Sequence, residues 1–329
     1  MADLSTTYMG LQLQNPLIVA SSGLTDSSDK IIELANKGAG AVVLKSIYEE
    51  EILMKASEMR HSGGEVNTQF GAGDYINHYA REENLQNYLE LIKESKAGCD
   101  IPIIASINCI TEKEWTSFGK SIEKAGADAL EINVFYMPAD LRAKSEEIEK
   151  RYFNLIKEIK KEISIPISLK VGYHFSALGS MLHALSATAI DGLVLFNRYY
   201  SPDIDIEKME ITSGGVLTKT EDLAMTLRWL ALISPKSQCD LAASTGIHSG
   251  TDFIKILLAG AQVGYIVSSL YKKGTDYISS MINEVEEWMK RHNFSSIDDF
   301  RGKLNSKDKE DHMLYERAQF MKYFSGYKG

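Results

Sequence analysis

The chain has 329 residues, 44% of them hydrophobic, and a formal net charge of −9 at pH 7. This acidic balance argues against nucleic acid or an anionic membrane surface as the main partner, and no apolar stretch approaches the roughly 20 residues that span a bilayer. The N-terminus lacks the basic and apolar regions of a signal peptide, and the three cysteines are too widely spaced for a metal motif, so we expect a cytoplasmic protein without a metal.

One alternating segment and eight apolar runs define the expected architecture. Leu4–Gln14 alternates loosely around Tyr8 and Gly10, which predicts a hairpin covering the N-terminal end of the fold. The eight runs, each stopping at a polar or glycine residue, are Pro16–Ala20, Ala41–Leu44, Ile101–Ala105, Ala129–Ile132, Ile165–Leu169, Gly192–Phe196, Leu241–Ala243 and Val263–Val267. Such runs, alternating with amphipathic stretches, are typical of buried parallel strands joined by helices. They predict an α/β fold, a (β/α)8 TIM barrel, in one domain over residues 1–304, with a charged and aromatic tail over 305–329.

The segments between the runs predict helices and two insertions on the catalytic face. The expected helices are Asp29–Lys37, Asn84–Lys96, Ser145–Glu162, Ala224–Ser234, Gly250–Ala259 and Thr275–Asn293. The first insertion, residues 48–100, holds a glycine-rich stretch around Asn67 that we interpret as a substrate lid. The second, residues 198–220, predicts a hairpin from Ile204–Ile211 and Val216–Leu217, ended by Gly214 and Gly215.

Small and polar residues follow the apolar runs. In a TIM barrel the C-terminal strand ends surround the active site, so these residues are expected around one mouth. They are Ser21, Ser22, Lys45, Ser46, Ser106, Asn133, Lys170, Asn197, Thr245, Gly246, Ser268 and Ser269. A ring of amides, hydroxyls and two lysines suits a large, polar, phosphorylated cofactor.

The ends of the last two runs and Lys170 carry the strongest cofactor signals. Thr245-Gly246 and Ser268-Ser269 are small and precede helices, so their backbone N–H groups could hold a phosphate, although tight turns alone also need small residues. Lys170 directly follows an apolar run, where a lysine is costly unless an anion pairs with it. The anion is either a structural carboxylate or part of a ligand; beside a flavin, Lys170 would stabilise the charge that reduction adds to the ring.

The ordered set of motifs resembles the class 1 dihydroorotate dehydrogenase family. The matching segments are Asn15-Pro16, Ala20–Gly23, Lys45-Ser46, Glu131–Asn133, Leu169-Lys170, Phe196-Asn197, Gly214-Gly215, Thr245-Gly246, Gly250–Ala261, Val267–Ser269 and Ser295–Lys303. The resemblance covers about residues 4–304 in the right order and spacing. It implies an FMN-dependent barrel enzyme that oxidises a CH–CH bond by hydride transfer to flavin N5, with dihydroorotate to orotate in pyrimidine biosynthesis as the first candidate reaction.

The resemblance also implies which residues bind the cofactor and the substrate. The implied FMN site comprises Ser21, Ser22, Lys45, Ser46, Ser106, Asn133, Lys170, Asn197, Gly214, Gly215, Thr245, Gly246, Ser268 and Ser269. Lys45, Asn67, Asn133 and Asn197 would contact the substrate, and Lys170 would act on the flavin.

Two segments depart from the family pattern. The family places its catalytic Cys or Ser three residues after the strand-four Asn, within Asn-x-Ser-Cys-Pro-Asn, and here that position is Tyr136. The ordinary pKa of Tyr is about 10, against about 8.5 for Cys. Deprotonating Tyr136 at pH 7 would therefore cost roughly 4 kcal/mol. Tyr136 is therefore either the catalytic base or a packing residue. The family's substrate loop is replaced around Asn67, the one residue retained.

Two alternatives stay open beside dihydroorotate oxidation. The barrel could bind FMN but act on another substrate or on none, because the base and the loop differ. It could instead be a non-redox lyase or aldolase with Lys170 as a Schiff-base nucleophile. A homodimer is expected, an electron-transfer partner with an iron–sulfur cluster is compatible with the sequence, and the electron acceptor is left open.

Overall fold

The structure, a computed structural model, describes residues 2–48, 72–108, 112–134, 136, 139–199, 201–307 and 315. Eight parallel strands pair side by side, and the pairing of the β4 and β6 strands closes them into a barrel. The strands are β3 (Leu17–Val19), β4 (Ala41–Val43), β6 (Ile103–Asn108), β7 (Ala129–Asn133), β8 (Ile167–Val171), β9 (Gly192–Leu195), β12 (Asp240–Ser244) and β13 (Val263–Ile266). A two-residue strand, β5 (Ile47–Tyr48), pairs with the end of β6. The predicted TIM barrel and its eight strands are confirmed.

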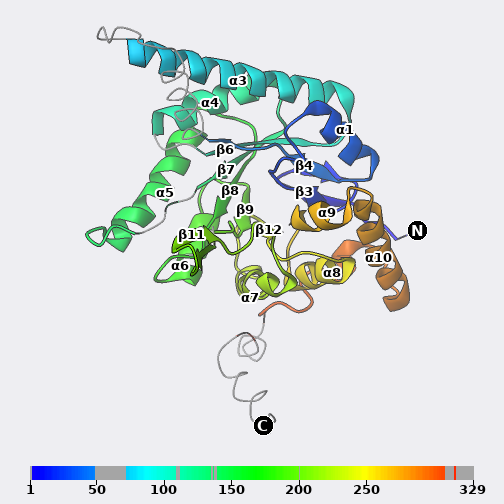
Figure 1. Cartoon of the computed structure of the whole chain (residues 1–329). Coiled ribbons are helices and arrows are strands. Elements are labelled where there is room, and N and C mark those ends of the chain that lie inside the picture. The colour runs from blue at the N-terminus through cyan, green and yellow to red at the C-terminus, as the bar shows by residue number, and fades with distance from the viewer. Residues whose placement is uncertain are drawn as a thin grey trace.

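Helices surround the barrel (Figure 1). They are α1 (Ser28–Asn36), α3 (Ala72–Gly98), α4 (Glu112–Ala125), α5 (Ser145–Lys160), α6 (Leu178–Ser186), α7 (Leu223–Ile233), α8 (Gly250–Ala259), α9 (Ser268–Lys273) and α10 (Tyr277–His292), with 3-10 turns η1 (Thr220–Asp222) and η2 (Ile297–Asp299). The bounds of α8 agree with the prediction because Ser249 caps its start and left-handed Gly260 ends it. Helix α3 begins twelve residues before the predicted start, and α4, α6 and α9 were not among the predicted helices.

The core has an inner and an outer layer, as alternation along each strand requires. Side chains such as Ile104, Ala129 and Val194 fill the barrel, whereas their strand neighbours pack against the helices. The N-terminal hairpin, β1 (Thr6–Tyr8) and β2 (Leu11–Leu13), adds Tyr8 to the inner layer. It closes the barrel at that end, as predicted.

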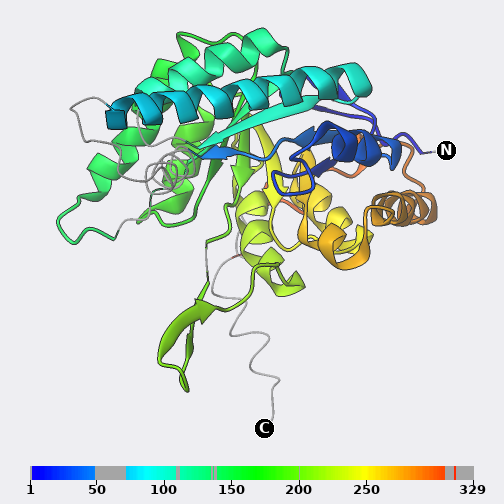
Figure 2. The same ribbon diagram turned by 45° about the horizontal axis from the view of Figure 1, so that its top comes forward.

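The second insertion contains an antiparallel hairpin of β10 (Pro202–Asp205) and β11 (Glu210–Ser213). The predicted pairing of Ile204–Ile211 with Val216–Leu217 is wrong, because the chain turns inside the first of these segments. Asp205 causes the turn: its side chain accepts hydrogen bonds from the backbone N–H groups of residues 207 and 208. The hairpin projects away from the barrel (Figure 2).

Backbone hydrogen bonds tie the end of the described chain to the barrel. Gly302 N–H donates to Leu257, Leu304 N–H to Leu258 and Ser306 N–H to Ala231. These bonds fix residues 302–306 against the C-terminal ends of α7 and α8. The division into a domain over 1–304 and a tail over 305–329 stays a prediction. No helix in the described part of the chain is long and apolar enough to cross a membrane.

Candidate active site

Three predicted cofactor residues form a continuous chain of hydroxyl groups at the ends of three neighbouring strands. The Oγ atoms of Ser21 and Ser46 are 3.0 Å apart, and those of Ser46 and Ser106 are 2.7 Å apart. Ser46 N–H also donates to Ser21 Oγ at 2.8 Å. Ser21 is half-buried at the mouth, while Ser46 and Ser106 are buried. The strand ends therefore bring these hydroxyls together, although they bond chiefly to one another.

Ser22 and Lys45 lie at the same mouth in different environments. The Ser22 hydroxyl donates to the Ala20 carbonyl and accepts from Leu24 N–H, so it stabilises the turn after β3. Lys45 is exposed after β4, and its backbone N–H donates to the Thr25 carbonyl at 3.0 Å. The sequence placed both residues correctly at the mouth. The structure gives the Ser22 hydroxyl a role in the turn itself.

The barrel interior below the mouth holds a buried carboxylate next to a lysine. Glu131 on β7 has no exposed surface. Lys170 on the neighbouring β8 strand pairs in register with Asn133, two residues closer to the mouth than Glu131. Burial raises the pKa of Glu131, and the Lys170 charge partly offsets this effect. Lys170 makes no ion pair within 4.0 Å among the described residues. No carboxylate of the described residues therefore forms a direct structural ion pair with Lys170.

Two predicted amides differ in how far the protein satisfies them. Asn197 donates through Nδ2 to the carbonyls of Val134 and Lys170 at 3.2 and 3.3 Å, which orients its amide across three strands. Asn133 is buried, and its Oδ1 has no hydrogen-bond partner among the described residues. A buried amide oxygen without a donor is costly, so Asn133 is a strong candidate to bind a ligand N–H or O–H group.

Arg198 and Ser201 hold the exposed Gly214–Gly215 segment against the loop after β9. The Arg198 guanidinium donates to the Gly215 carbonyl at 3.0 Å and also to the Val216 carbonyl. Gly214 N–H donates to the Ser201 carbonyl at 2.8 Å. The sequence did not assign Arg198 a role, and its position directly after the predicted Asn197 was the available signal.

The segment after the two glycines is tied to the end of β13. Thr218 N–H donates to Ser268 Oγ at 3.0 Å, and Thr218 Oγ1 lies 2.8 Å from His248 Nε2. Lys272 donates to the Thr218 carbonyl at 2.7 Å. Burial and the Lys272 charge lower the pKa of His248, which favours the neutral ring. The Ser268 hydroxyl is thus already bonded, while the Ser269 hydroxyl is buried without a partner among the described residues.

Thr245 and Gly246 follow β12 in an unusual backbone conformation. Their φ angles are +81° and +83°, a region that is strained for a β-branched threonine. Thr245 Oγ1 donates to the Phe196 carbonyl at 3.1 Å. Gly246 has no room for a side chain, because a Cβ there would lie 2.2 Å from the backbone nitrogen of Leu223. Strained backbone of this kind concentrates at functional sites.

The start of α8 offers fewer free donors than its sequence suggested. Ser249 Oγ accepts from Asp252 N–H, the Asp252 carboxylate accepts from His248 N–H, and the Glu284 carboxylate accepts from Gly250 N–H. The backbone N–H groups of Gly246 and Ile247 have no hydrogen-bond partner among the described residues. A phosphate at this point would therefore bind before the helix rather than on its first turn.

Tyr136 packs on helix α5. Its ring lies edge-on to Tyr152, with centroids 5.3 Å apart, and the Arg151 guanidinium lies 5.8 Å from its centroid. Burial raises the pKa of Tyr152. These contacts fit the packing role that the sequence left open, and the role of catalytic base stays a prediction. Asn67 and the predicted lid lie outside the described residues.

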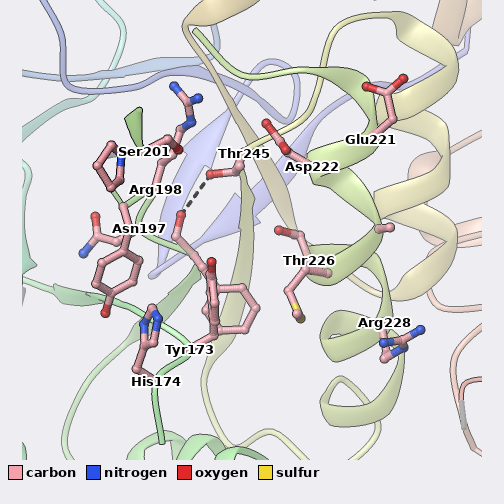
Figure 3. Close-up of a pocket in the computed structure, with 15 residues that line it drawn as sticks. Tyr173, His174, Asn197, Arg198, Ser201, Glu221, Asp222, Thr226, Arg228 and Thr245 are labelled. Atoms are coloured by element: carbon pink, nitrogen blue, oxygen red, sulfur yellow. Dashed lines mark hydrogen bonds between the residues drawn. The ribbon is translucent and has the colours of Figure 1, made fainter. Parts of the chain in front are cut away.

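A cavity of about 730 Å³ opens beside the mouth, between the loops after β8 and β9 and helix α7 (Figure 3). Two predicted cofactor residues, Asn197 and Thr245, line it. Its aromatic wall was not predicted: the Tyr173 and His174 rings stack at 4.7 Å, and Tyr199 meets His174 at 4.1 Å. These rings stand just past two strand ends, which was the signal that could have found them. The described residues contain no cluster that could hold a metal ion.

Comparison with known proteins gives one consistent result. A family model described as dihydroorotate dehydrogenase matches residues 3–289. The catalytic subunit of dihydroorotate dehydrogenase B (NAD(+)) from Thermoplasma acidophilum is 26% identical over 312 residues, which cover 92% of this chain and 99% of the relative. The corresponding protein of Methanocaldococcus jannaschii is 24% identical over 305 residues, covering 89% and 95%. Dihydroorotate dehydrogenase A (fumarate) of Lactococcus lactis is 25% identical over 322 residues, covering 92% and 99%.

Proposed function

Because the chain belongs to the dihydroorotate dehydrogenase family, we propose that it binds FMN at the barrel mouth and oxidises dihydroorotate or a closely related small cyclic carboxylate. The observation that carries the proposal is the placement of Lys170 and Asn133 on adjacent strands, both at the mouth. Lys170 has no ion-pair partner and Asn133 Oδ1 no hydrogen-bond donor among the described residues. Together they present a positive charge without a direct ion pair and an unused acceptor to one ligand.

The residues present fit the phosphate of FMN as well as its ring. Ser269 Oγ is buried without a partner, and the Gly246 N–H group nearby also lacks one among the described residues. Two unsatisfied donors at neighbouring strand ends are what a phosphate oxygen would bind. Gly214 and Gly215, held in place by Arg198, would close the site on the side of the hairpin.

The chemistry that bound FMN supplies is acceptance of a hydride. Lys170 would stabilise the negative charge that reduction adds to the ring, because a fixed ammonium in a partly buried site needs no reorganisation. Asn197, whose amide is held by two carbonyls, orients the substrate together with Asn133 and Lys45. The substrate C5 proton needs a separate acceptor, and Tyr136 is the proposed one.

One observation favours a second candidate, an FMN barrel with a different substrate. The residue at the family's base position, Tyr136, packs against Tyr152 and Arg151 on α5. If the phenol only packs, dihydroorotate lacks its family base here, and a substrate that needs no such base would be favoured. The cavity beside the mouth, which we call the rim cavity, has an aromatic wall and offers space for a larger ring compound.

Partners and cellular context belong to the proposal as well. Two of the relatives are named as catalytic subunits of an NAD(+)-linked enzyme. By analogy, this chain passes its electrons to a separate protein with an iron–sulfur cluster, or directly to a small oxidant. We expect a cytoplasmic homodimer.

The visible spectrum of the purified protein tests the cofactor. A yellow protein that releases FMN on denaturation supports the proposal. A colourless protein that FMN cannot reconstitute contradicts it, and would favour the aldolase alternative, which trapping of a carbonyl substrate on Lys170 with borohydride would then establish.

A further inference from the structure

Glu131 occupies an unusual place, inside the barrel and below the proposed flavin site. Its side chain is fully buried, and neither carboxylate oxygen has a hydrogen bond that meets normal geometry among the described residues. An unsatisfied buried carboxylate is expensive and needs an explanation. The proposed hydride transfer does not use it.

Lys170 from β8 and Tyr265 from β13 act directly on this carboxylate. Tyr8 from β1 and Tyr88 from α3 lie farther away, and the Glu131 charge contributes to raising their pKa values. Burial raises the pKa values of all three tyrosines, so none of them ionises near neutral pH. The Lys170 charge favours the ionised carboxylate, and burial favours the neutral acid. The net effect is a pKa of Glu131 above its ordinary value, with burial as the largest cause.

A chain of serine hydroxyls leads from the register partner of Glu131 to the mouth. Ser106 is this register partner on β6, so both side chains point into the barrel, and the hydroxyls of Tyr265 and Ser106 lower the pKa of Glu131. From Ser106 the path continues through Ser46 to Ser21, with Oγ separations of 2.7 and 3.0 Å. Ser21 is half-buried at the mouth. Each hydroxyl in this path can both accept and donate a proton.

We propose that Glu131 is a proton acceptor beneath the flavin site and that Ser106, Ser46 and Ser21 connect it to the mouth. A solvent proton enters at Ser21, each serine passes one proton on and receives one, and a new O–H bond forms on Glu131. If FMN bound at the mouth were reduced by two electrons, the added negative charge would make protonation of the nearby carboxylate more favourable. Protonation would remove the negative charge of Glu131 itself and so reduce its repulsion with a reduced ring.

The first test needs no flavin, so it is independent of the proposed function. Infrared spectra of the flavin-free protein should contain a protonated carboxyl band at low pH that Glu131→Gln lacks. In D2O the band should shift as its proton exchanges. Ser46→Ala should slow this exchange at least tenfold, and Ser46→Thr, which keeps the hydroxyl, should restore it.

Ser168→Ala is the matched control for the path. Ser168 is also a buried register partner of Glu131 without a hydrogen bond among the described residues, but it lies outside the serine chain. Its removal should leave the exchange rate unchanged. Equal exchange in wild type and Ser46→Ala, or a carboxyl band that survives in Glu131→Gln, would overturn the proposal.

The second test rests on the proposed function and measures protons taken up on reduction of the holoenzyme between about pH 5 and 9. Within that range the wild type should take up one more proton per two electrons than Glu131→Gln. Its midpoint potential should therefore fall by about 30 mV more for each pH unit, which corresponds to a tenfold change in the equilibrium constant. Equal uptake in both proteins would show that Glu131 does not respond to the flavin. Absence of FMN would defeat the proposed function, and the infrared result would still decide whether Glu131 exchanges protons through the serines.

Discussion

Replacing Gly246 by alanine adds one methyl group where the backbone after β12 approaches the start of α7. The new Cβ would lie 2.2 Å from Leu223 N, 2.6 Å from Leu223 Cα and 2.8 Å from the Asp222 carbonyl carbon. These are backbone atoms, so no side-chain rotation relieves the overlap. Overpacking of this kind costs about 1–3 kcal/mol. The φ of +83° adds about 1–2 kcal/mol for any residue with a Cβ.

Gly246→Ala should therefore lower the free energy of unfolding by about 2–5 kcal/mol. This is a large share of the roughly 5–15 kcal/mol by which a folded domain is usually stable. Gly10→Ala is the matched control, because Gly10 has a similar φ of +77° and nothing within 4 Å of its Cβ position. It should lose only the conformational part, about 1–2 kcal/mol. A bulkier substitution at position 246 would disturb the fold together with the flavin site, so alanine is the better probe.

Urea unfolding of the flavin-free variants measures both losses without a contribution from cofactor binding. The loss in free energy of unfolding should be about 1–3 kcal/mol larger for Gly246→Ala than for Gly10→Ala. Gly246→Ala should also weaken FMN binding. Equal losses in the two variants would refute the packing argument. Unchanged FMN affinity in a folded Gly246→Ala protein would contradict the proposed position of the phosphate.

Three further predictions test individual side chains. Tyr136→Phe should lower dihydroorotate oxidation at least about tenfold, and the wild-type rate should rise towards alkaline pH, in steady-state assays; full activity would leave the phenol only its packing on Tyr152. Lys170→Ala should lower the flavin midpoint potential by about 30–65 mV, the equivalent of a charged hydrogen bond of about 1.5–3 kcal/mol, whereas an unchanged potential would place the lysine away from the ring. Glu131→Gln should become more stable than wild type as pH rises above about 4.3. The raised pKa lets the native state bind more protons than the unfolded state, so wild-type stability falls with rising pH. Urea unfolding at several pH values should show a gain of about 1–3 kcal/mol, and a pH-independent difference would argue against it.

The barrel was predictable because its strands carry a signal that burial imposes on every one of them. The run Ala129–Ile132 is apolar because Leu130 and Ile132 face the helices while Ala129 faces the interior. The same alternation places Glu131 inside the barrel, so its burial could have been inferred from the sequence. The long α3 was harder to find, because poor helix formers such as Gly73 obscure its first turns.

The site was predictable in position but not in its contacts. Parallel strands end at one mouth, so Ser21, Ser46 and Ser106 had to lie there. That their hydroxyls bond to one another depends on the register between β3, β4 and β6, which no local pattern encodes. The aromatic wall of the rim cavity comes from loop residues such as Tyr173, where periodicity gives no information.

Anaerobic mixing of the purified protein with dihydroorotate tests the central proposal most directly. We expect the visible flavin absorbance to bleach and one orotate to form for each flavin reduced. A protein that holds FMN but neither bleaches nor forms orotate at any pH would contradict dihydroorotate as the substrate and leave only the flavin site.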